Sequence, residues 1–174
     1  WAEADGLDNC IAEQWTPIIC DVVDSQGFKV IASAATTTGK DVMPRVSGRL
    51  DGGMASDVIA VECHDEKPVY IRPMYAGNVN GAVQITTDVS AVTVRQTAFE
   101  PATPAAEASE AVEKIKIKKD EAIMDRIAFN GFEKSDSKRP DLTEASVVVC
   151  GGRGMKSKED FASLCETLAD LLNG

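Results

Sequence analysis

The turn Gly151–Gly154 (GGRG) holds the residues of this sequence that are best suited to bind a ligand. It follows the apolar run Val147–Cys150 and contains one cation, Arg153. Glycine lets another group approach the backbone closely, and open α/β sheets bind ligands at the carboxyl ends of their parallel strands. The order of glycines lacks the G-x-G-x-x-G spacing of nicotinamide-binding turns. The residues by themselves leave two interpretations open: a ligand-binding role for Arg153, or a surface arginine in a turn whose glycines serve only the turn.

A helix is predicted directly after this turn. Ser157 is a suitable N-cap, with Asp160 as a weak capping-box partner three residues later, and Asn173–Gly174 suits a C-terminal cap. Apolar residues recur at steps of three and four and form one stripe: Phe161, Leu164, Cys165, Leu168, Leu171 and Leu172. The apolar run, the turn and this helix together predict a strand–turn–helix unit whose strand is buried on both faces.

The segment Thr36–Asp41 (TTTGKD) shares some features with a phosphate-binding P-loop. A P-loop has a glycine where this sequence has Ala34, and a magnesium-binding serine or threonine where it has Asp41. We interpret residues 36–40 as a polar loop between a strand and a helix, where free N–H groups can face an anion. The two departures favour a structural turn over an anion-binding site.

The five cysteines and the single histidine do not predict a metal site or a catalytic site. The cysteines at positions 10, 20, 63, 150 and 165 are widely spaced and form no CxxC pair, whereas zinc sites take grouped ligands. We expect them to be small buried hydrophobic residues in a reducing compartment, and His64 to be exposed in a turn. No serine lies in a G-x-S-x-G setting, and no spaced pair of carboxylates suggests acid–base catalysis.

The composition is that of a soluble globular protein. The 174 residues are 44% hydrophobic and 26% charged, and the net charge of −10 argues against a general nucleic-acid binder. No apolar stretch is long enough to span a membrane. The acidic start Trp1–Asp5 is unlike a signal peptide and lacks an initiator methionine, so we expect a processed or trimmed chain.

The hydrophobic pattern predicts an α/β fold. The predicted elements are helices at 7–23 and 42–50, strands at 28–35, 58–63 and 69–72, two adjacent strands with a short connection at 82–87 and 91–95, a brief strand at 115–117 and a helix over 120–132.

Composition also predicts the domain organisation. Residues 98–111 are rich in Ala, Pro, Glu and Ser and carry few large apolar side chains, which is typical of a linker. We expect a partial N-terminal α/β domain at 1–100, a linker with a charged segment and short strand or helix at 101–140, and a partial second domain at 141–174.

Three segments of the sequence resemble the electron transfer flavoprotein α subunit family. Arg139–Phe161 (RPDLTEASVVVCGGRGMKSKEDF) looks like the segment that opens the flavin-binding domain of that family. Thr36–Val58 is similar to the family's FGK-x-x-x-PR block followed by SDv, and Arg72–Asn78 is similar to its R-x-x-YAGN strand end. The order and spacing of the three segments agree with the family. The resemblance covers residues 10–172 except for 101–133.

The resemblance implies a mostly parallel sheet with flanking helices, followed by the first strand–turn–helix of a second, FAD-binding α/β domain. Proteins of this family are αβ heterodimers that hold one FAD and act as electron carriers rather than enzymes with their own substrate. They carry electrons from acyl-CoA dehydrogenases and other dehydrogenases to the membrane electron transfer flavoprotein–ubiquinone oxidoreductase. In the family the arginine of GGRG lies against the flavin, which implies a cofactor-binding role for Arg153. A cation there stabilises the negatively charged reduced flavin.

The resemblance further implies an incomplete chain. Family members carry an additional N-terminal strand region and continue with further FAD contacts beyond the last helix. We therefore expect an exposed sheet edge, and weak or no FAD binding by this chain alone. The alternative is a non-redox structural or binding module derived from the same fold. The resemblance implies a β subunit as partner, a role in fatty acid β-oxidation, and the mitochondrial matrix, or the cytoplasm for a bacterial protein.

Overall fold

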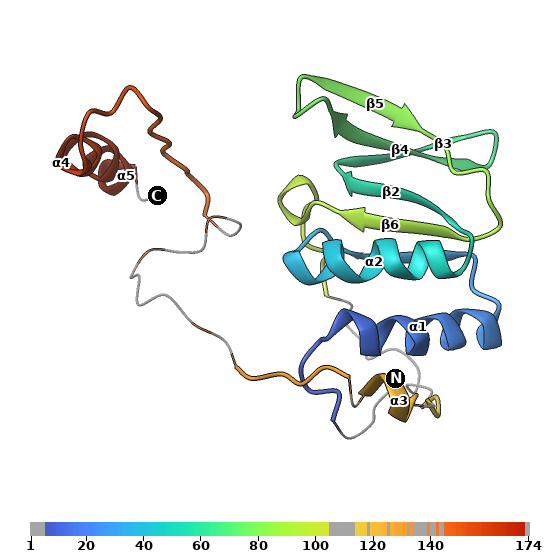
Figure 1. The fold of residues 1–174 in the computed structure, drawn as a ribbon. Coiled ribbons are helices and arrows are strands. Elements are labelled where there is room, and N and C mark those ends of the chain that lie inside the picture. The colour runs from blue at the N-terminus through green and yellow to red at the C-terminus, as the bar shows by residue number, and fades with distance from the viewer. Residues whose placement is uncertain are drawn as a thin grey trace. The chain divides into compact units, whose positions relative to one another are not determined.

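The computed structural model describes residues 6–104, 114–117, 119–124, 126–131, 133, 139, 142 and 145–172 (Figure 1). The chain divides into two compact units, Trp1–Asn130 and Gly131–Gly174. The first unit holds two small sheets and two long helices, and the second holds the GGRG turn and the helix that follows it.

A three-stranded parallel sheet forms the centre of the first unit. Its order is β1 (Val30–Ala34), β6 (Ser90–Val94) and β2 (Gly53–Val58), so that β6 pairs with both neighbours. The middle strand is the most deeply buried, with Ala91 and Thr93 fully inaccessible, as expected for a strand covered on both faces. The predicted α/β class with a parallel sheet is confirmed.

Two helices cover this sheet in succession. α2 (Thr37–Arg49) packs against all three strands, and α1 (Ala12–Gln26) packs against α2 (Figure 1). Their shared core contains Ala12, Cys20 and Val46. The predicted polar loop at 36–40 is in fact the first turn of α2, because Thr36 Oγ1 accepts a hydrogen bond from the Gly39 N–H at 3.2 Å and caps the helix early.

A second, antiparallel sheet packs against β2. It consists of β3 (Ala60–His64), β4 (Lys67–Met74) and β5 (Val79–Val83), in that order. Strands β2, β4 and β6 contribute Ala55, Val58, Tyr70 and Val92 to one common core.

The predicted pairing of residues 82–87 with 91–95 is wrong. β5 pairs with β4, whereas β6 lies in the parallel sheet between β1 and β2. Alternating polarity specifies which face of a strand is buried, but it does not specify the neighbouring strand. The sequence pattern also missed most of β2, because GMASDV contains few large apolar residues.

The segment after the second sheet is less regular than predicted. A single bridge residue, Ile115, lies within the strand predicted at 115–117. Of the helix predicted over 120–132, the described residues form only the short α3 (Glu121–Met124). Residues 126–131 are not helical, and residues 125 and 132 lie outside the described residues.

The second unit contains one helical stretch that matches the predicted C-terminal helix. It comprises α4 (Lys158–Phe161), a π-helical turn (Ala162–Glu166) and α5 (Thr167–Leu171). Ser157 caps it as predicted: its Oγ accepts a hydrogen bond from the Asp160 N–H at 3.0 Å. The run 147–150 is not a paired strand, because no described residue of this unit supplies a hydrogen-bonded neighbour.

Candidate functional site

The GGRG turn leads directly into the capped start of α4. The Met155 N–H donates to the Gly152 carbonyl at 3.0 Å, which closes a tight turn just before Ser157. The turn thus holds Arg153 between an apolar segment and the N-terminus of a helix.

The three glycines of the turn have different structural roles. A Cβ on Gly151 would lie 2.8 Å and 2.9 Å from the Cδ2 and Cε2 atoms of Phe161, and 3.0 Å from Sγ of Cys165. The helix packs closely there, so a side chain at position 151 would have to displace the Phe161 ring. A Cβ on Gly152 or Gly154 would meet nothing within 4 Å, and neither residue has a left-handed φ. Packing and backbone conformation therefore leave these two glycines unexplained.

Arg153 is exposed and makes no hydrogen bond or ion pair with any residue that the structure describes. Its neighbours Gly152 and Gly154 add no side chain that would cover the surface around the guanidinium. An exposed cation on an open backbone surface is available to a negatively charged ligand.

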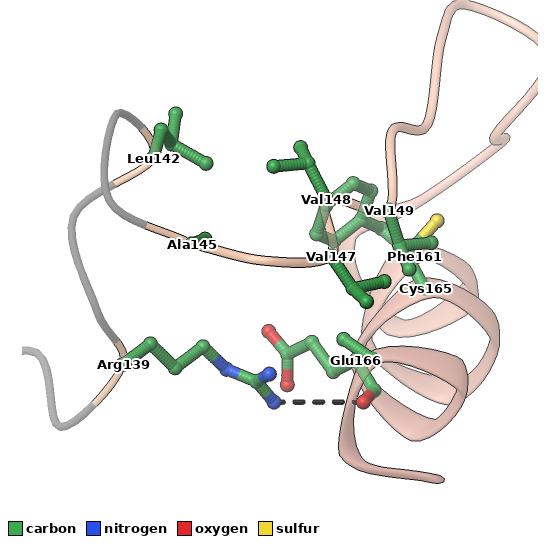
Figure 2. Close-up of a pocket in the computed structure, with 10 residues that line it drawn as sticks. Arg139, Leu142, Ala145, Val147, Val148, Val149, Phe161, Cys165 and Glu166 are labelled. Carbon is green, nitrogen blue, oxygen red and sulfur yellow. Dashed lines mark hydrogen bonds between the residues drawn. The ribbon is translucent and has the colours of Figure 1, made fainter. Parts of the chain in front are cut away.

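An apolar pocket lies beside the turn (Figure 2). Its volume is about 170 Å³, and its lining includes Val147 and Val149, which are half-buried, together with Phe161 and Cys165. At its edge the Arg139 side chain donates to the Glu166 carbonyl at 3.5 Å and pairs with the Asp170 carboxylate at 2.6 Å. The lining is mostly aliphatic and the space is small, so we interpret it as packing space between the 147–149 segment and the helix.

The other residues that the sequence analysis considered do not form a catalytic or binding site with the residues that the structure describes around them. The Gly39 N–H in the P-loop-like segment is occupied by the Thr36 cap. His64 lies at the end of β3, is exposed as predicted, and its Nε2 is 2.9 Å from a Glu62 carboxylate oxygen. Within the described ranges no three His, Cys, Asp or Glu residues are grouped as metal ligands, and no helix is long and apolar enough to cross a membrane.

The prediction that the cysteines are buried is only partly correct. All five are free thiols. Cys20 and Cys165 are buried and Cys10 is half-buried, but Cys63 and Cys150 are exposed. Burial raises the pKa of the Cys20 thiol and of the Cys10 thiol.

A second polar cluster, whose assembly the sequence did not indicate, lies at the carboxyl ends of the parallel strands. Arg95 follows β6 and binds the Asp57 carboxylate through two hydrogen bonds, of 3.1 Å and 2.5 Å. Arg72 of β4 donates from Nε and Nη2 to the carbonyl and the hydroxyl of Ser56. The hydrogen bonds from Arg95 lower the pKa of Asp57 more than burial raises it. These residues come from three strands, so only the fold brings them together.

Comparison with known proteins identifies both parts of the chain. Residues 1–120 match the electron transfer flavoprotein domain, and residues 141–174 match the electron transfer flavoprotein FAD-binding domain. The second match includes the GGRG turn.

Relatives from several kingdoms align with nearly the whole chain. "Probable electron transfer flavoprotein subunit alpha, mitochondrial" of Cryptococcus neoformans var. grubii is 37% identical over 173 residues, which are 98% of this chain and 48% of the relative. "Electron transfer flavoprotein subunit alpha, mitochondrial" of Oryza sativa subsp. japonica is 33% identical, covering 98% of this chain and 48% of its own length. "Electron transfer flavoprotein subunit alpha" of Pseudomonas aeruginosa is 37% identical, covering 93% and 49%.

This chain therefore spans about half the length of the curated relatives that it matches. The two domain matches follow one another in the order that the sequence predicts, and the parallel sheet of the first unit has the expected α/β architecture. The chain belongs to the electron transfer flavoprotein α subunit family.

Proposed function

We propose that this chain is part of an electron carrier that holds FAD, and that Arg153 contacts the flavin in the complete protein. The observation that carries the proposal is the exposed, unpaired Arg153 between two glycines that no packing in the described residues requires. The match of residues 141–174 to an FAD-binding domain supports it.

The proposed role of Arg153 is electrostatic. A guanidinium that lies beside the isoalloxazine stabilises the negative charge that the flavin gains on reduction. The side chain then sets how easily the cofactor accepts electrons, and it forms no bond with a substrate. The protein is accordingly an electron carrier without an enzymatic substrate of its own.

The proposed partners follow from membership of the family. The α subunit would pair with an electron transfer flavoprotein β subunit, accept electrons from acyl-CoA and other dehydrogenases during fatty acid β-oxidation, and deliver them to electron transfer flavoprotein–ubiquinone oxidoreductase. The mitochondrial names of the fungal and plant relatives support the mitochondrial matrix as its location. The cytoplasm is the corresponding location for a bacterial protein such as the Pseudomonas relative.

The test uses the complete α–β protein with Arg153→Gln. We expect FAD to remain bound and its reduction potential to fall, by about 60 mV for a one-electron step if the lost stabilisation is about 1.4 kcal/mol. Spectroelectrochemical titration measures this shift. Arg153→Lys keeps the cation and should recover part of the shift.

Lys156→Gln is the matched control, because it removes a nearby exposed cation that lies outside the glycine turn. If Arg153→Gln and Lys156→Gln shift the potential equally, or if neither shifts it, the proposed role of Arg153 is wrong.

A further inference from the structure

A pocket in the first unit lies where the parallel strands β2 and β6 end. We call it the strand-end pocket; its lining includes Asp57, Arg72, Tyr75 and Arg95, and its volume is about 450 Å³. The turn between β4 and β5 and the N-terminus of α2 lie at the same end of the unit (Figure 1). Open α/β sheets bind ligands at this end of their strands.

The charges of the strand-end pocket are unbalanced in favour of cations. Among the described residues that line it, Asp57 is the one carboxylate, and Arg95 binds that group with both Nε and Nη2. Arg72 also lines the pocket, but its hydrogen bonds go only to the neutral Ser56 carbonyl and hydroxyl, at 2.8 Å and 2.9 Å. Two of its five N–H donors are used, so the remaining donors are available to a ligand, while its charge also interacts with the Asp57 carboxylate.

The surroundings add to this positive charge. Lys40, in the first turns of α2, lies close enough to Asp57 to help lower the pKa of that carboxyl, as does Arg72. The protein as a whole has a net charge of −10. A local excess of cations in an acidic protein attracts small anions to that place.

The backbone around the pocket is strained. Tyr75 and Ala76 have φ values of 51° and 56°, and Asp57 has a φ of 58°, in the left-handed region that costs a non-glycine residue free energy. The turn Tyr75–Ala76 is closed by the Gly77 N–H, which donates to the Met74 carbonyl at 3.1 Å. Turns with two left-handed residues favour Asn and Gly at both central positions. Here the first central residue is Tyr75, which is 78% exposed. Strain of this sort collects at binding sites.

We propose that the strand-end pocket binds the oxyanion group of a small molecule, a phosphate or a carboxylate, with Arg72 as its principal donor. Planar guanidinium groups match both anions with paired hydrogen bonds. Arg95 and Lys40 supply long-range attraction, and Tyr75 forms an exposed wall of the pocket. This inference does not depend on the proposed flavin role.

The experiment titrates the 174-residue chain with inorganic phosphate and, separately, with acetate, at constant ionic strength, by calorimetry and by amide chemical shifts. We expect one site with a dissociation constant in the millimolar range for at least one anion. Arg72→Gln should weaken that binding about tenfold, because a charge-assisted pair of hydrogen bonds is lost. The anion that binds more tightly identifies the group that the pocket takes.

Two controls separate binding from folding. Arg49→Gln removes an exposed arginine at the other end of α2 and should leave the affinity unchanged. Arg72 also holds the backbone at Ser56, so Lys40→Gln serves as a variant that leaves every hydrogen bond of the pocket intact; it should weaken binding about twofold. Its matched control is Lys29→Gln. Lys29 directly precedes the first residue of β1 and therefore lies at the end of the sheet that is opposite the pocket.

Three results would overturn the proposal: neither anion binds, Arg72→Gln folds and binds as tightly as the wild type, or Lys40→Gln and Lys29→Gln have the same affinity as the wild type. The second result would leave Arg72 with a purely structural role at the β2 bulge, and the third would show that charge near the pocket does not attract the anion.

Discussion

Single side chains explain the irregular point of the parallel sheet. The pairing of β2 with β6 changes register between Ala55 and Val58, and Asp57 lies in this bulge with a left-handed φ of 58°. Its N–H donates to the buried Thr93 hydroxyl at 2.9 Å, and its carboxylate binds Arg95. These bonds offset the cost of the backbone conformation.

The Asp57–Arg95 pair predicts a pH-dependent stability. Because the pKa of Asp57 is lowered in the folded protein, its contribution is present above the pKa of the unfolded chain and is lost as the pH falls through the folded value. Asp57→Asn keeps a residue that tolerates a left-handed φ but removes the charge. We expect it to lower the free energy of unfolding by about 1 kcal/mol at pH 7, and by progressively less below about pH 4.

Urea denaturation at several pH values measures this effect. Asp88→Asn is the control, because Asp88 is 97% exposed and pairs with Lys29 at 3.5 Å, so its removal should change little. A loss for Asp57→Asn that stays constant from neutral to acidic pH would show that the charge does not contribute.

Among the elements, α2 shows how closely a helix can approach the sheet that it covers. Gly39 is buried in its first turn, and a Cβ there would overlap the backbone carbonyl oxygen of Ala34 and lie 2.8 Å from the Ser33 hydroxyl. Backbone atoms cannot move aside as a flexible side chain can. The helix therefore lies against the end of β1 only because residue 39 has no side chain.

Two glycines of α2 should respond in opposite ways to the same substitution. Gly39→Ala should destabilise the first unit by about 2 kcal/mol through overpacking. Gly48→Ala should stabilise it by up to about 1 kcal/mol, since Gly48 is exposed, a Cβ there meets nothing within 4 Å, and alanine favours the helix. Thermal and urea unfolding compare the two variants with the wild type. Similar effects of both substitutions would contradict this account of the packing.

At the scale of the whole molecule, the chain matches two family domains in succession. It covers 48% of the length of several relatives and includes 34 residues, 141–174, that match the FAD-binding domain. In the second unit, Leu164, Leu171 and Leu172 are exposed to 60%, 75% and 50% of their full area. An apolar face of this extent is typical of a surface that packs against further protein.

We predict that the 174-residue chain alone purifies without a stoichiometric flavin. Arg153 is the single residue to which we assign a flavin contact, and one exposed cation cannot hold a large cofactor against its loss of freedom on binding. The measurement is the visible absorbance of the purified chain after incubation with FAD and desalting. A flavin-to-protein ratio near one would contradict the prediction, whereas the complete α–β protein should retain FAD under the same treatment.

The sequence by itself determined the local features and the family. Helical spacing and the Ser157 cap located the C-terminal helix, and the apolar run 28–35 located β1, because these signals depend on neighbours along the chain. The three motifs identified the α subunit family and so directed attention to Arg153, whose flavin role stays a prediction.

The tertiary structure decided the features that depend on contacts between residues far apart in the sequence. It placed β6 between β1 and β2 instead of beside β5, and it showed that Gly151 lies against the Phe161 ring whereas Gly152 and Gly154 have open space around them. It also brought Asp57, Arg72 and Arg95 from three strands into one pocket. A strand's own residues specify its buried face, but its neighbours depend on the free energy of the whole packed sheet, which no local pattern contains.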